Sequence, residues 1–228
     1  MARVIADLHP YLQELVSLLI KKCDAQGLKI GISECVRTVK EQNDLYAKGR
    51  TVGGSIVTNA KGTSYSSCHQ WGIAFDFYRN DGKGAYNESG NFFEKVGKIG
   101  QSLNLEWGGA WVSIKDKPHF QLPIYGSSAS TLKKLYTTPS NYMKSLDYKP
   151  SATVTSKSSQ KDVLWLQERL ALCTGKDITL DKKFGKQVSN AIKIYWKQLD
   201  WNIAEPEENG FYKAGVKTIE ALSQFRTK

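Results

Sequence analysis

The sequence has few of the residues that mark metal or redox chemistry. Only three histidines and four cysteines occur among 228 residues. The cysteines, Cys23, Cys35, Cys68 and Cys173, are scattered and form none of the close pairs of a thiolate metal site. We expect free thiols, as in a protein made in the cytoplasm. Cys68 could be mistaken for a nucleophile, but we expect a buried and unreactive thiol there.

Long apolar runs are also missing. No stretch is apolar enough over the length needed to cross a bilayer, so stable membrane insertion is not expected. Residues 1–7 lack the basic start and apolar core of a secretory signal. We therefore expect the protein to be made in the host cytoplasm and to act elsewhere only after release.

Positive charge exceeds negative charge without being concentrated anywhere. Residues 1–125 carry 15 Lys/Arg against 12 Asp/Glu, residues 126–159 carry 5 against 1, and residues 160–228 carry 12 against 9. No basic face with interleaved aromatic residues is present, which argues against a nucleic-acid partner. A diffuse positive surface suits weak attraction to an anionic cell wall, or simply favours solubility.

Two of the three histidines lie in a set that suits a divalent metal. His69 and Asp76 fall within one segment, and Asp116 stands three positions before His119 in a second. Two imidazoles and one carboxylate would leave a fourth zinc position open for water, as in catalytic zinc sites. The remaining histidine, His9, precedes a helical pattern and is expected to cap or pack that helix.

Alternation predicts how these side chains meet. From Gly72 to Tyr78 the apolar residues fall on one face, which leaves Asp76 on the other. A second short strand would place Phe120 in the core and His119 on the opposite side. If the two strands are neighbours, Asp76 and His119 project together and His69 completes the site from the preceding loop.

A carboxylate beside such a site could move protons. Asp116 is our candidate for general base and acid, although Asp before Lys-Pro is also an ordinary turn residue. Glu106 is the alternative carboxylate. The tryptophans of the segment that follows Glu106 are expected to form a wall or core.

The first 125 residues or so resemble the zinc L-alanyl-D-glutamate peptidases found as bacteriophage endolysins, which are related to D-Ala-D-Ala carboxypeptidases. The resemblance rests on the order and spacing of several segments: residues 37–46, 49–51, 57–60, 67–76, 106–111 and 116–120. It implies an α+β fold of the Hedgehog/DD-peptidase type, with a small antiparallel sheet and flanking helices.

The resemblance also implies roles for individual residues. The zinc ligands match His69, Asp76 and His119, and the catalytic residue matches Asp116. The carboxypeptidase branch typically has Glu at this last position, so Asp favours the endopeptidase.

The family's substrate-anchoring residues match Arg37, Gln42 and Ser67. The guanidinium of Arg37 suits a carboxylate or an oxyanion. From the residues alone, Arg37 could equally form a surface salt bridge with Glu41. Gln42 and Ser67 could simply meet solvent or a turn.

Length and composition predict two domains: residues 1–140 as the catalytic domain, 141–159 as a linker rich in Ser, Thr and Lys, and 160–228 as a helical domain. The helical part shows a weak repeat, in which Gly185, Val188, Ala191 and Ile192 correspond to Gly215, Thr218, Ala221 and Leu222. It resembles the three-helix peptidoglycan-binding domain of wall hydrolases. A generic helical bundle is the alternative.

These observations predict a monomeric endolysin that uses Zn²⁺ to cleave the L-Ala–D-Glu bond of peptidoglycan and so lyses bacteria. A D-Ala-D-Ala carboxypeptidase is the second hypothesis. The third is a non-catalytic cell-wall-binding protein with a structural zinc. The sequence leaves open whether the source is a phage or a bacterial autolysin.

Overall fold

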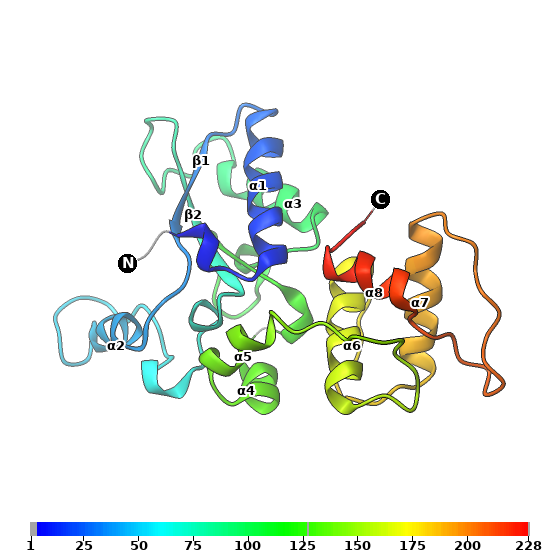
Figure 1. Cartoon of the computed structure of the whole chain (residues 1–228). Helices are drawn as coiled ribbons and strands as arrows, with labels where there is room; N and C mark the ends of the chain where they lie inside the picture. Colours follow the sequence, from blue (N-terminus) through cyan, green and yellow to red (C-terminus); the bar gives the residue numbers. More distant parts are fainter. Residues whose placement is uncertain (1–3, 127, 228) are drawn as a thin grey trace. The chain divides into compact units, whose positions relative to one another are not determined.

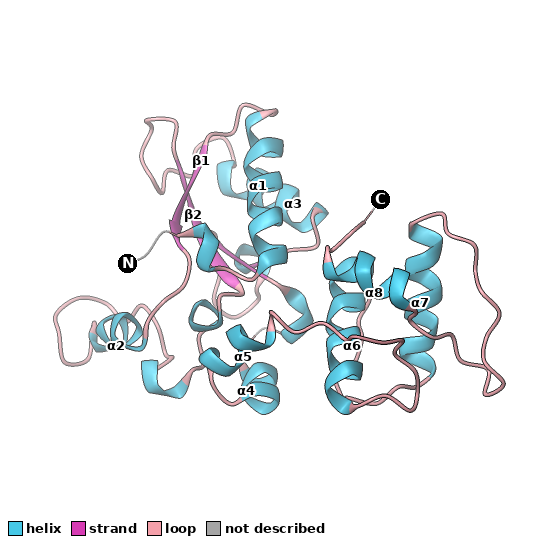
Figure 2. Cartoon of the chain, in the orientation of Figure 1, coloured by secondary structure: helices cyan, strands magenta, loops and turns pink. Residues whose placement is uncertain are grey.

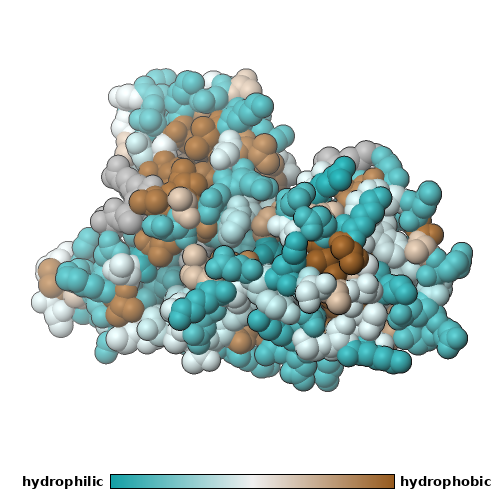
Figure 3. Space-filling view, viewed as in Figure 1, coloured by the Kyte–Doolittle hydropathy of each residue, from teal (hydrophilic) through white to brown (hydrophobic). Residues whose placement is uncertain are grey.

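The computed structural model describes residues 4–126 and 128–227, and the chain forms two compact units, Met1–Leu146 and Asp147–Lys228 (Figure 1). Within the described residues, no helix is both long and apolar enough to span a membrane. On the face drawn in Figure 3, hydrophilic side chains cover much of the surface, with apolar ones gathered in patches.

The N-terminal unit is built on a four-stranded antiparallel sheet with strand order β1-β2-β4-β3 (Figure 2). The strands are β1 (Ile30–Glu34), β2 (Ala74–Arg79), β3 (Glu106–Trp107) and β4 (His119–Gln121). The predicted pairing of the strands that carry Asp76 and His119 is confirmed, because these two residues face each other across β2 and β4.

One face of the sheet forms an aromatic core. Phe77 lies 5.3 Å from Phe120 and 5.3 Å from Phe93, measured between ring centroids. Phe93 belongs to α3 (Phe92–Ser102), which contacts α1 (Pro10–Asp24). Burial of these rings supplies the main driving force for holding the helices on the sheet.

Two glycines let α3 approach the sheet closely. A Cβ atom on Gly97 would lie 2.4 Å from the Trp107 ring, and one on Gly100 would lie 2.3 Å from the Phe120 ring. Both distances are too short for carbon atoms in contact. The small residues therefore fix the spacing between α3 and the strands that carry the site.

Helix starts follow local capping rules. His9 is the N-cap of α1, where its Nδ1 accepts from the Tyr11 backbone N–H at 3.2 Å, so its capping role is confirmed. Helix α2 (Val39–Ala47) starts with a capping box formed by Thr38 and Glu41. Short 3-10 helices lie at Ile5–Asp7, Gly62–Ser64, Cys68–Trp71, Gly108–Ala110 and Pro123–Tyr125.

Residues 141–159, the expected linker, do not form a separate linker in the structure. Its first residues lie in α5 (Pro139–Ser145), which follows α4 (Ser130–Tyr136) in the N-terminal unit. Its later residues belong to the C-terminal unit, where Val154 forms a β-bridge with Ala214 and the Tyr148 hydroxyl donates to Asp162. Polar composition suggested flexibility here, but a few buried contacts outweigh it.

The C-terminal unit contains helices α6 (Gln160–Thr174), α7 (Lys186–Gln198) and α8 (Val216–Ser223). They lie within residues 160–228, where a helical domain is predicted. The α7 residue Trp196 donates from Nε1 to Thr218 Oγ1 of α8 at 2.9 Å. This bond satisfies a buried indole N–H and ties the two helices together.

Candidate active site

The structure brings His69, Asp76 and His119 together from three elements. Asp76 and His119 lie side by side on β2 and β4, and His69 comes from the 3-10 helix Cys68–Trp71 just before β2. His119 Nδ1 is 3.0 Å from Asp76 Oδ1 and 3.2 Å from His69 Nε2. His69 Nε2 is 3.3 Å from Asp76 Oδ1.

This triangle of donor atoms fits a divalent metal. Ligands about 2.0 to 2.1 Å from a tetrahedral zinc ion are separated from one another by roughly 3.3 Å. The observed separations of 3.0, 3.2 and 3.3 Å agree with that spacing. Three protein donors leave the fourth tetrahedral position for water or substrate.

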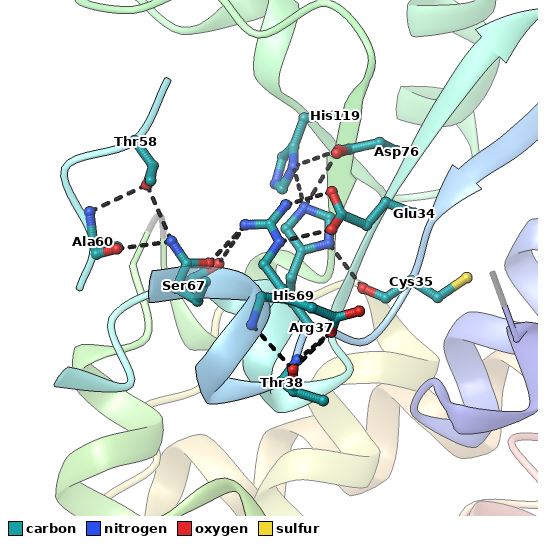
Figure 4. Close-up of polar contacts among 12 residues, drawn as sticks. Glu34, Cys35, Arg37, Thr38, Thr58, Ala60, Ser67, His69, Asp76 and His119 are labelled. Atoms are coloured by element: carbon teal, nitrogen blue, oxygen red, sulfur yellow. Dashed lines mark hydrogen bonds and ion pairs between the residues drawn. The ribbon is translucent and has the colours of Figure 1, made fainter. Parts of the chain in front are cut away.

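Neighbouring groups determine the protonation of His69 and Asp76. His69 Nδ1 lies 2.9 Å from the carbonyl oxygen of Cys35, which only accepts, so Nδ1 carries a proton and Nε2 is the nitrogen that faces the metal position (Figure 4). Burial alone would raise the pKa of Asp76, but the charge of His69 and hydrogen bonds from both imidazoles lower it overall. Asp76 is therefore an ionised carboxylate, as metal binding requires.

The pKa of His119 is shifted in the opposite direction to that of Asp76. Burial alone would lower its pKa, but the hydrogen bond and charge of Asp76 raise it overall. Without a metal, this histidine therefore tends to hold a proton on the nitrogen that faces Asp76. A metal ion has to displace that proton.

Asp116 approaches the metal ligands from the loop before β4. Its backbone N–H donates to the Gly108 carbonyl at 3.0 Å, and its own carbonyl accepts from the His119 N–H at 3.2 Å. A Cβ on Gly108 would lie 2.5 Å from the backbone carbonyl oxygen of Asp116, so only glycine lets the two segments approach this closely. Burial raises the pKa of Asp116; the charge of His119 opposes this shift and that of Asp76 adds to it.

Arg37 is buried in a network and does not pair with Glu41, so the surface salt bridge considered above is wrong. Its Nε and Nη2 donate to the two oxygens of Glu34 at 2.7 and 2.5 Å (Figure 4). Glu41 instead accepts from Thr38, at 2.9 Å from the backbone N–H and 2.8 Å from the hydroxyl. Sequence reasoning missed Glu34.

The other two candidate substrate residues contact the remaining edge of Arg37, at Nη1. Arg37 Nη1 donates to Gln42 Oε1 at 2.7 Å and lies 3.5 Å from Ser67 Oγ. Gln42 is fully buried, and its amide donates to the Ala60 carbonyl at 2.8 Å. The three residues thus form one polar cluster, which is joined to the 3-10 helix of His69 because the Arg37 backbone N–H donates to the His69 carbonyl at 3.2 Å.

Both oxygens of the alternative carboxylate, Glu106, already accept hydrogen bonds. Its Oε1 accepts from the Trp111 indole N–H at 2.7 Å, and its Oε2 accepts from the Gln121 amide at 3.0 Å. Cys68 is buried, and burial followed by the charge of Glu106 raises its pKa to about 12. The expected burial of this thiol is therefore confirmed, and its raised pKa is typical of an unreactive cysteine.

Comparison with known proteins gives a family model and several relatives that each match part of the chain. A family model described as D-alanyl-D-alanine carboxypeptidase matches residues 60–122. The peptidoglycan L-alanyl-D-glutamate endopeptidase CwlK of Bacillus subtilis (strain 168) is 36% identical over 129 residues, which cover 52% of this chain and 75% of that protein.

A second relative comes from a phage. The L-alanyl-D-glutamate peptidase of Listeria phage A118 is 29% identical over 145 residues, which cover 61% of this chain but only 44% of that protein. The crystal structure of the Serratia marcescens L-Ala D-Glu endopeptidase ChiX aligns with a TM-score of 0.41 and 23% identity, over 53% of this chain and 84% of that one.

The family model spans the elements that carry the ligand triangle, and the match to CwlK is close enough over enough of that protein to assign a family. The chain belongs to the metallopeptidases of peptidase family M15, and His69, Asp76 and His119 are its candidate metal ligands.

Proposed function

We propose that this protein is a zinc-dependent endopeptidase that hydrolyses the L-Ala–D-Glu bond of the peptidoglycan stem peptide. The observation that carries the proposal is the triangle of His69, Asp76 and His119 donor atoms with a half-buried carboxyl group, Asp116, beside it. Both curated relatives are named for this bond, which supports the same specificity.

The chemistry divides between the metal and the protein. A bound zinc ion would supply Lewis acidity, which polarises the scissile carbonyl and makes water more acidic. Asp116 accepts the proton of the attacking water as its oxygen bonds to the carbonyl carbon. It then gives this proton to the nitrogen as the C–N bond breaks, so that the amine leaves neutral.

Arg37, Gln42 and Ser67 orient the peptide in this proposal. Glu34 neutralises Arg37 and accepts from its Nε and Nη2, so a peptide would meet the Nη1 edge, which Gln42 and Ser67 already contact. The rigid cluster holds that edge in place before substrate arrives, which reduces the entropy lost on binding.

The C-terminal unit serves in this proposal as a peptidoglycan-binding domain, and the whole chain as a monomeric endolysin that reaches the wall after release from the host cytoplasm. Three helices within residues 160–228 support the first part. A phage protein among the relatives supports the second. Holding the wall would raise the local concentration of stem peptides at the active site.

Mass spectrometry of muropeptides tests the cleavage site. Digestion with the zinc-loaded protein is expected to release fragments that begin with D-Glu, and a chelator is expected to stop their formation. Loss of a single terminal alanine would instead indicate the carboxypeptidase for which the matching family model is named. Absence of any cleavage would favour a wall-binding protein with a structural metal.

A further inference from the structure

His119 is joined to Gln121 and Glu106 by a buried chain of hydrogen bonds. Gln121 Oε1 lies 3.1 Å from His119 Nε2, on the side of the ring away from Asp76. The Gln121 amide nitrogen donates to Glu106 Oε2 at 3.0 Å and to the Gly126 carbonyl at 3.1 Å. Gln121 is only 1% exposed, so water does not compete for these bonds.

The chemistry of its partners fixes which way the Gln121 amide points. A carboxylate and a backbone carbonyl can only accept hydrogen bonds, so the NH₂ group must face Glu106 and Gly126. The amide oxygen must then face His119. A flipped amide would set its oxygen against two other acceptors and leave its NH₂ group facing the ring, which is unfavourable in a buried site.

This orientation in turn fixes the proton on His119. An amide oxygen only accepts, so Nε2 must carry a hydrogen. The lone pair available for a metal is therefore on Nδ1, the nitrogen that lies 3.2 Å from His69 Nε2 and 3.0 Å from Asp76 Oδ1. The other neutral tautomer would direct an N–H at the metal position.

Glu106 is held as firmly as the amide that it orients. Strand pairing places it directly opposite Gln121, and the Trp111 indole N–H holds its other oxygen at 2.7 Å. The Trp111 ring also packs against the His119 ring, with centroids 5.2 Å apart. The carboxylate thus has two donors and is directed away from the reacting groups.

We propose that Gln121 and Glu106 are positioning residues that hold His119 in the tautomer whose Nδ1 binds the metal. The inference rests on the proposed metal site but not on the bond that is cleaved. It assigns to Glu106 a role other than proton transfer.

Zinc titration of the full-length protein tests this role without any substrate. In competition with a chromophoric chelator, Gln121→Met is expected to weaken Zn²⁺ binding about 10- to 100-fold, as is typical when a hydrogen-bond partner of a ligand is lost. Glu106→Gln should have a smaller effect, because its amide oxygen can still accept from Gln121. The matched control is Gln167→Met, since Gln167 is also 1% exposed but lies in the C-terminal unit.

The tautomer can be observed directly in the unaltered protein. With ¹⁵N-labelled histidine and bound Zn²⁺, His119 should show a protonated Nε2 and an unprotonated Nδ1. A metal-bound Nε2, or a folded Gln121→Met protein with unchanged Zn²⁺ affinity, would overturn the inference. If Gln121→Met does not fold, the Zn²⁺ affinity of Glu106→Gln and the ¹⁵N spectrum of the unaltered protein decide the question. Cleavage at another bond would refute the proposed function and leave these measurements unaffected.

Discussion

At the scale of single residues, the site separates groups that hold a metal from groups that do chemistry. His69, Asp76 and His119 point their donor atoms at one position, whereas both oxygens of Glu106 are engaged by neighbouring donors. Asp116 is left as the carboxyl group with a raised pKa beside the ligands. Its surroundings therefore match the requirement for a group that both takes and gives a proton.

Replacing Asp116 by Asn should abolish hydrolysis while zinc content and melting temperature stay close to those of the parent. The amide cannot accept the proton, and loss of such a group typically costs about 100-fold or more in rate. Muropeptide release, metal analysis and thermal unfolding together measure this. Asp44→Asn on α2 is the control, since Asp44 pairs only with Lys40 at the surface. Appreciable turnover by Asp116→Asn would assign proton transfer to another group.

Replacing Glu34 by Gln should destabilise the protein, because it leaves the guanidinium of Arg37 buried without its counter-charge. Both side chains are nearly inaccessible, at 9% and 11% exposed. We expect the free energy of unfolding to fall by about 2 to 3 kcal/mol. Denaturant titration of the zinc-loaded protein measures the change. An unchanged midpoint would show that the pair contributes no net stability.

At the scale of elements, alternation was sufficient for the two strands that carry Asp76 and His119. It placed Asp76 and His119 on one side of adjacent strands, as the structure has them. Glu34 could not be found this way, because the register of β1 shifts between Ile32 and Glu34. Such an irregularity breaks the two-residue period that sequence reasoning depends on. The network around Gln121 was missed because it depends on contacts across strands.

The fit of α3 against the sheet gives a prediction at this scale. Gly100→Ala should lower the free energy of unfolding by about 1 to 2 kcal/mol, although alanine favours a helix. The added methyl would meet the Phe120 ring, which is fully buried beside Phe77 and cannot move aside.

The control on the same helix is Gln101→Ala, at an exposed position. It gains helix propensity without a clash, so its unfolding midpoint should stay level or rise. If the unfolding midpoint of Gly100→Ala also rose, the close packing of α3 would not limit stability.

At the scale of the whole molecule, metal content should change how stability depends on pH. In metal-free protein, the raised pKa of His119 contributes stability that is complete below its ordinary value of 6.5 and is lost as pH rises through the folded-state pKa. The lowered pKa of Asp76 contributes stability that is complete above 3.8 and is lost as pH falls through its folded-state pKa.

The chelated protein is therefore expected to be more stable at pH 6 than at pH 8. The zinc-loaded protein should not lose stability over this range, because a metal binds the deprotonated imidazole. Thermal unfolding at several pH values measures both. In chelated His119→Gln the loss between pH 6 and 8 should be smaller, and an equal loss would place its origin elsewhere.

The division into two units predicts separable activities. A chain that ends at Leu146 should cleave soluble muropeptides about as fast as the whole protein but should lose activity on intact walls, since the unit that we propose binds the wall is gone. Turbidity loss of cell-wall suspensions measures this. Adding residues 147–228 as a separate chain should not restore it. Equal rates on walls would exclude a targeting role for the C-terminal unit.

The chain order of the ligands has a consequence for biosynthesis. His69 and Asp76 are translated well before His119, which follows Asp76 by 43 positions and enters the sheet between β2 and β3. A nascent chain on the ribosome therefore lacks a complete chelating set until nearly all of the N-terminal unit has emerged. Binding of one metal ion by all three residues therefore has to wait until the last strand has been inserted.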